Sequence, residues 1–184
     1  MSRGLRRLAL PLALASSLCA RAQATPNTRP VATLSLSAGA MIVNARSDGR
    51  VELAVAGRDS TLQLTFLAAD AQRWADSTTR LVHEATRRTA SADRRSALED
   101  EAQDGAAFTL IRSVTNGEAT YRVFVANRSY GGFVFELAPG EAQAVVAAIG
   151  RGARTAVDLA RESSLSPAAD PALAIAGGAP QASP

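Results

Sequence analysis

Several kinds of reactive side chain are scarce in this 184-residue chain, and their scarcity removes whole classes of chemistry. All 20 basic residues are arginine, so no lysine is available for a Schiff base or for a lysine-bearing phosphate loop. There is one cysteine, Cys19, and one histidine, His83. A transition-metal site built from thiolate and imidazole ligands is therefore not expected. We also expect no bound cofactor.

The first 24 residues have the three parts of a secretory signal peptide. Arginines at positions 3, 6 and 7 precede an apolar run from Leu8 to Leu18, and Ala22-Gln23-Ala24 is a small-x-small cleavage site. The apolar run is far shorter than the roughly 20 residues of a membrane-spanning helix, so we predict cleavage after Ala24. The mature chain is then periplasmic or secreted and has no transmembrane span.

Cleavage would change the charge and the cysteine content of the protein. It removes four arginines and no acid, which leaves 16 basic and 17 acidic residues and a net charge of −1. Net charge then gives no attraction to nucleic acid. Cleavage also removes Cys19, so the mature chain has no disulfide. A lipoprotein attached through Cys19 is disfavoured because Leu18, which precedes it, is not a small residue.

Two segments of the mature chain share one pattern, which indicates an internal repeat. A two-residue turn signal precedes each copy, Asp48-Gly49 before the first and Asn116-Gly117 before the second, and such pairs favour tight hairpins. These landmarks favour duplication over a chance likeness of two amphipathic segments. The other matches are Val-Ala-Gly-Arg at 55–58 with Val-Ala-Asn-Arg at 125–128, and Asp-Ala-Gln at 70–72 with Glu-Ala-Gln at 141–143.

Apolar residues alternate along the segments beside these turns, which predicts β-strands with one apolar face. A helix is expected after the third strand of each repeat, covering that face. Gly150 and Gly152 are expected to end the second helix, and an additional strand is expected at 31–37. The predicted core residues are Met41, Val43, Ala45, Val51, Leu53, Val55, Leu62, Leu64, Phe66, Tyr121, Val123, Val125, Phe133, Phe135 and Leu137 in strands, and Ala71, Trp74, Thr78, Leu81, Val82, Ala142, Val145, Val146 and Ile149 in helices.

The predicted fold class is α+β, with two repeated antiparallel β-meander-plus-helix units that form one pseudo-twofold domain. The first unit is placed at 25–84 and the second at 106–162. Residues 85–105 mix charges of both signs, and we predict that they extend the first helix or form a linker. Residues 163–184, rich in alanine and proline, are predicted to be a disordered tail.

The paired plan of three strands and a helix resembles the single-strand nucleic-acid-binding folds of the whirly and purine-rich-element-binding kinds. The resemblance is one of architecture, matches no family motif and carries no binding residue onto this chain. It implies single-strand nucleic-acid binding as an alternative function. Export and the mature net charge of −1 argue against a nucleic-acid partner.

Two groups of residues are candidates for a catalytic or metal-binding role, but neither matches the pattern that such a role requires. His83 has no Gly-x-Ser-x-Gly nucleophile motif to serve, so we interpret it as an ordinary histidine at the end of the first helix. Glu99, Asp100, Glu101 and Asp104 could attract calcium, but their spacing fails the EF-hand pattern, and an acidic stretch of linker is the better interpretation. No catalytic residue and no metal ligand is therefore predicted. A hydrolase with paired carboxylates stays as an alternative.

Arg122, Phe124, Arg128 and Tyr130 form the candidate binding patch. Phe124 alternates away from the predicted core residues of its strand and shares a strand face with Arg122. Arginine beside aromatic side chains is typical of surfaces that stack on bases, sugars or protein partners. The alternative is that a second layer, such as the other sheet, covers Phe124. The sequence thus predicts an exported, non-enzymatic binding module of a bacterial envelope, whose partner is an envelope protein or a small ligand.

Overall fold

The structure, a computed structural model, describes residues 26–57, 61–84, 94–100, 105–128 and 131–165. The first half of the chain contains β1 (Thr28–Leu36), β2 (Gly39–Arg46), β3 (Arg50–Ala56), β4 (Thr61–Leu67) and α1 (Ala68–His83). The second half contains β5 (Arg94–Asp100), β6 (Ala106–Thr115), β7 (Glu118–Asn127), β8 (Gly131–Leu137) and α2 (Pro139–Leu165). The prediction of an α+β fold with two similar strand-and-helix units is confirmed.

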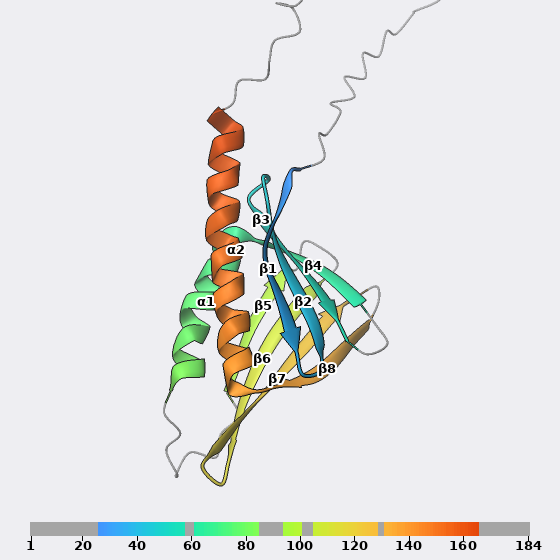
Figure 1. Cartoon of the computed structure of the whole chain (residues 1–184), viewed down its shortest axis with the longest axis vertical. Helices are drawn as coiled ribbons and strands as arrows, with labels where there is room; N and C mark the ends of the chain where they lie inside the picture. The colour runs from blue at the N-terminus through green and yellow to red at the C-terminus, as the bar shows by residue number, and fades with distance from the viewer. Residues whose placement is uncertain (1–25, 58–60, 85–93, 101–104, 129–130, 166–184) are drawn as a thin grey trace, which may run out of the picture.

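Each half forms an antiparallel sheet whose strands follow the order of the chain, β1-β2-β3-β4 in sheet A and β5-β6-β7-β8 in sheet B (Figure 1). The predicted alternation holds in both sheets. The central strands bury every second side chain, as at Met41, Val43 and Ala45 in β2. Phe133 and Phe135 of β8 are only half-buried, although they pack against the core. One continuous hydrophobic core takes in the inner faces of both sheets and the apolar faces of both helices.

The two turn signals produce hairpins of different kinds. Asn116 and Gly117 both have positive φ angles, 53° and 84°, and Thr115 pairs directly with Glu118 across the turn. This is the two-residue geometry that Asn-Gly favours. In the first unit Gly49 has a φ of 76° whereas Asp48 does not have a positive φ, and three residues separate β2 from β3.

The two helices lie side by side along one side of the sheets, and the C-terminal part of α2 extends past them (Figure 1). Each helix also contacts the first strand of the other unit, α1 with β5 and α2 with β1. Neither helix combines the length and the apolar character that a membrane span requires.

The prediction that Gly150 and Gly152 end the second helix is wrong, because α2 continues to Leu165. Both glycines are buried at close contacts. A Cβ atom at Gly152 would lie 2.7 Å from Cγ1 of Val43, and one at Gly150 would lie 3.2 Å from Cβ of Ala75. The glycines therefore allow α2 to approach sheet A and α1. Burial of the helix outweighs the helix-propensity cost of about 1 kcal/mol per glycine.

The prediction for residues 85–105 is wrong over Arg94–Asp100, which form the edge strand β5 and pair with β6. Leu98 points into the core and is 2% exposed. Charged residues lie at both ends of this segment, so its sequence does not show the alternation of apolar and polar residues that predicts a strand. Glu99, assigned to an acidic linker, lies in this strand. Residues 85–93 and 101–104, the signal peptide and positions 166–184 lie outside the described residues.

Glu141 joins the two units at the start of α2. Its Oε2 accepts a hydrogen bond from the backbone N–H of Ala138 at 2.8 Å, as in a capping box. The same carboxylate accepts bonds from the N–H of Ser37 at 2.6 Å and from its hydroxyl at 2.9 Å. The Ala138 bond, with the two Ser37 bonds, holds the pKa of Glu141 below its ordinary value of 4.5 despite an opposing contribution from burial.

We expect Glu141→Gln to lower the free energy of unfolding by about 1 kcal/mol at pH 7. Because the pKa is depressed on folding, the charged carboxylate stabilises the fold above its unfolded-state pKa. That contribution is lost as the pH falls through the folded-state pKa. Urea unfolding at pH 7 and at pH 3 measures the difference. As a control, Asp70→Asn removes the matching acid of α1. Among the described residues Asp70 pairs with the exposed Arg73 alone, so this change should cost less than about 0.5 kcal/mol. An equal gap between Glu141→Gln and the wild type at both pH values would contradict the prediction.

Candidate binding surfaces

The side of sheet B that faces away from the core is the first candidate surface, called here the outer face. Strand register arranges it in three rows. Phe124 stands in the middle row and is 38% exposed, and Val134 beside it is 56% exposed. In the described structure neither sheet A nor a helix covers Phe124. The rows are Arg95, Ile111, Arg122 and Glu136; Ala97, Thr109, Phe124 and Val134; and Glu99, Ala107, Ala126 and Gly132.

The structure brings together only part of the predicted patch. Arg122 and Phe124 share the outer face, and Arg122 donates a long hydrogen bond of 3.4 Å from Nη2 to the hydroxyl of Ser113. Arg128 is exposed just beyond the end of β7, where its side chain lies against Gly105. Tyr130 lies outside the described residues, so its place in the patch stays a prediction.

Sequence reasoning missed the neighbours of Phe124 on the adjacent strands. Ile111 and Val134 are exposed or half-exposed and flank the Arg122–Phe124 pair. Their own alternation places them on the outer face, because they are out of phase with the core residues of β6 and β8. Only the register shows that Val134 lies directly opposite Phe124.

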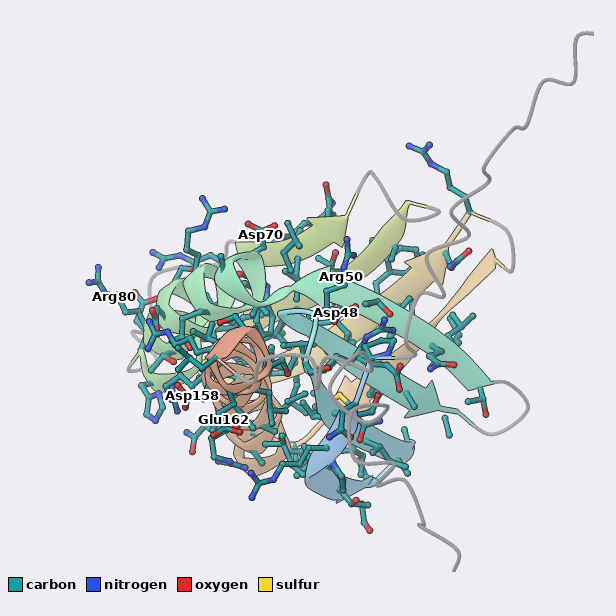
Figure 2. The ribbon with its side chains drawn as sticks, turned by 90° about the horizontal axis from the view of Figure 1, so that it is seen from above. Asp48, Arg50, Asp70, Arg80, Asp158 and Glu162 are labelled. Carbon is teal, nitrogen blue, oxygen red and sulfur yellow. The ribbon has the colours of Figure 1, made fainter. Side chains whose placement is uncertain are left out.

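The second candidate surface is a groove between α1 and β5, called here the α1–β5 groove. It consists of two hollows of about 560 Å³ and 790 Å³ that meet at Ser77. The helix contributes residues spaced three or four apart and the strand contributes consecutive residues. Figure 2 shows Arg80 extending away from the body of the molecule, and Asp70 at the other end of α1. The helix wall includes Asp70, Arg73, Trp74, Ser77, Arg80 and Glu84, and the strand wall is residues 94–99.

A polar cluster closes one end of this groove and holds the C-terminus of α1. Arg112 is only 5% exposed, and its Nη2 donates to the carbonyl oxygen of Glu84 at 3.0 Å. Arg94 pairs with the Glu84 carboxylate at 2.6 Å, and the Tyr121 hydroxyl donates to the carbonyl of Val82 at 3.4 Å. Positive charge at the end of a helix is favourable because carbonyl groups are exposed there. We interpret this cluster as structural.

His83 and Trp74 also line the groove. His83 is exposed at the end of α1, as predicted, and its Nδ1 lies 2.8 Å from the carbonyl oxygen of Thr79. Trp74 is 4% exposed and packs edge-on against Phe108. Its indole N–H is buried and has no acceptor among the described residues. Across the described ranges, no three acidic, histidine or cysteine side chains gather in a group that could hold a metal ion.

Comparisons with known proteins add little to this geometry. No protein-family model matches the chain, and no curated protein matches its sequence. One solved structure that is similar is the crystal structure of WHY3 from Arabidopsis thaliana, at 9% sequence identity and a TM-score of 0.29. The match covers 76% of this chain and 85% of that chain. At this TM-score the likeness carries no argument about the fold or the function.

Proposed function

We propose that this protein is an exported binding module of the bacterial envelope and that it engages a protein partner through the outer face of sheet B. The signal-peptide pattern of residues 1–24 supports export to the periplasm or beyond. The observation that carries the proposal is Phe124, a large aromatic side chain held in an open sheet with 38% of its surface exposed.

The surroundings of Phe124 favour a protein over a small ligand. One neighbouring row consists mainly of the small residues Ala107, Ala126 and Gly132, so the Phe124 ring projects above the side chains beside it. Small-molecule sites are concave and enclose most of the ligand, whereas an open sheet face suits a broad protein contact. Aromatic and arginine side chains are also the usual anchors of protein interfaces. The partner would place an apolar side chain on Phe124 and a carboxylate near Arg122.

The test is capture of the envelope partner by the immobilised mature protein. We expect Phe124→Ala to reduce capture by roughly tenfold, because loss of an aromatic anchor costs more than 1 kcal/mol. Ile42→Ala is the matched control, since Ile42 is 39% exposed on the outward side of sheet A. Equal capture by the wild type and both variants would contradict the proposal. Salt-sensitive binding of single-stranded DNA that disappears in Phe124→Ala would favour the nucleic-acid alternative instead.

A further inference from the structure

We infer that two copies of this chain associate by pairing β5 with β5 of the second copy, antiparallel, about a twofold axis at Ala97. The inference concerns the edge of sheet B and goes beyond the proposed binding role of its outer face. The pairing would join the two B sheets into one continuous sheet.

The edge of β5 is open to another strand. Within the described residues the backbone of β5 pairs with β6 alone, and no described strand pairs with its other side. The side chains of Ser96 and Arg94 hydrogen-bond to Thr78 of α1 and to Glu84, which follows α1. Proteins commonly block such an edge with a proline, a bulge or charged side chains, and β5 has only the charges. The first strand of sheet A has a proline and a bulge, since the register of β1 shifts between Pro30 and Ala32. β5 contains no proline and pairs with β6 without a register shift.

Space for the second strand is present beside this edge. The α1–β5 groove runs along residues 94–99, with α1 as its opposite wall. Trp74 lines the groove and holds a buried indole N–H without an acceptor in the described part of the chain. A buried donor of this kind is normally satisfied, and a strand entering the groove would bring carbonyl oxygens near it.

The charges of β5 complement those of a second, antiparallel β5, which favours β5 of another copy as the strand that pairs with this edge. The strand reads Arg-Arg-Ser-Ala-Leu-Glu-Asp, with bases first and acids last. Antiparallel pairing about Ala97 places Arg95 opposite Glu99 of the second copy, and by symmetry the same contact forms again. Both side chains are exposed, and neither has an ion-pair partner within the described ranges. Opposite charges directly across a strand pair are stabilising, whereas a parallel arrangement or a shifted register would lose these contacts.

The experiment measures the dissociation constant of the mature chain by sedimentation equilibrium. We expect a monomer–dimer equilibrium with a dissociation constant on the order of micromolar, because edge pairing buries less surface than a standard interface. Arg95→Glu and Glu99→Arg should each weaken the dimer by at least about tenfold, since each change turns two attractions into repulsions. An equimolar mixture of the two variants should dimerise to within about threefold of the wild type, because both contacts are again between opposite charges.

Two controls locate the contact. Arg151→Glu makes the same charge change on an exposed position of α2 and should leave the dimer unchanged. Trp74 is the chain's single tryptophan, so its indole N–H resonance should shift between monomer and dimer. Recovery in the mixture also shows that each variant folds. A monomer at all concentrations, a dimer insensitive to both charge reversals, or a mixture that fails to recover would overturn the inference, whatever the outcome for Phe124.

Discussion

Replacing Phe108 with alanine is expected to lower the free energy of unfolding by about 3–5 kcal/mol. Phe108 is fully buried on β6 and is among the largest side chains of the core. Its ring meets Trp74 of α1 edge-on, with centroids 5.6 Å apart and an interplanar angle of 83°. The substitution therefore removes apolar burial, an aromatic pair between sheet B and α1, and the atoms that fill the space between them. Urea unfolding followed by far-ultraviolet circular dichroism measures the loss.

Phe124→Ala is the matched control for this change. Both phenylalanines belong to central strands of sheet B, but Phe124 stands on the outer face, opposite Thr109. Its removal should cost less than about 1 kcal/mol, because the ring is already partly in water and no closed cavity forms. Comparable losses for the two variants would show that a further layer covers the outer face in solution and that Phe124 is not exposed there.

Gly152→Leu is expected to destabilise the fold by about 3 kcal/mol, even though leucine is the better helix former. A Cβ atom at this position would lie 2.7 Å from Cγ1 of Val43 and 3.3 Å from Cγ1 of Val51. Val43 and Val51 are both fully buried in sheet A. Neither valine has a flexible end that can move aside, so α2 must shift away from the sheet. Thermal and urea unfolding of the variant measure the cost.

Gly140→Leu tests the same substitution where it meets no obstacle. Gly140 belongs to the first turn of α2, and a Cβ atom there would have no described neighbour within 4 Å. This variant should be neutral or slightly more stable, by up to about 1 kcal/mol, because glycine has the poorer helix propensity. If Gly152→Leu were as stable as Gly140→Leu, the close approach of α2 to sheet A would be wrong.

The strands with one clean apolar face were predictable from the sequence. In the central parts of β2, β3, β4 and β7, buried side chains alternate with exposed or half-buried ones, since only one face of each strand meets the core. The Asn116-Gly117 hairpin was also predictable, because its geometry depends on two residues that tolerate positive φ. These features depend on residues close together in the chain.

The errors arose where distant residues decide the local structure. β5 has charged residues on both faces, and it is a strand because β6 supplies hydrogen bonds and a site for Leu98. The glycines of α2 look like a helix end, and they continue the helix because sheet A and α1 lie against them. Arg112 is in phase with the core residues of β6, and it is buried because the carbonyl of Glu84 accepts its hydrogen bond.

The candidate surfaces were likewise predictable from the sequence only in part. Alternation alone placed Phe124 and Arg122 on one face of their strand. The sequence could not show whether a second layer covers that face, because coverage depends on how the sheets and helices pack. Nor could it show that Arg95 and Glu99 stand on an unpaired edge beside α1, since that requires both the strand β5 and its neighbours.

By itself, the sequence determined the repeated plan, the identity of most core residues, the tight second hairpin and the pattern that predicts export. All of these follow from periodicity or from short motifs, whose physics acts within a few residues. Only the tertiary structure decided that the second unit begins with an additional strand, β5, as the first unit begins with β1. It also decided that α2 continues through Gly150 and Gly152, and that the edge of β5 beside α1 has no strand partner among the described residues. Those features depend on hydrogen bonds and packing between segments far apart in the chain, where no local pattern records the outcome.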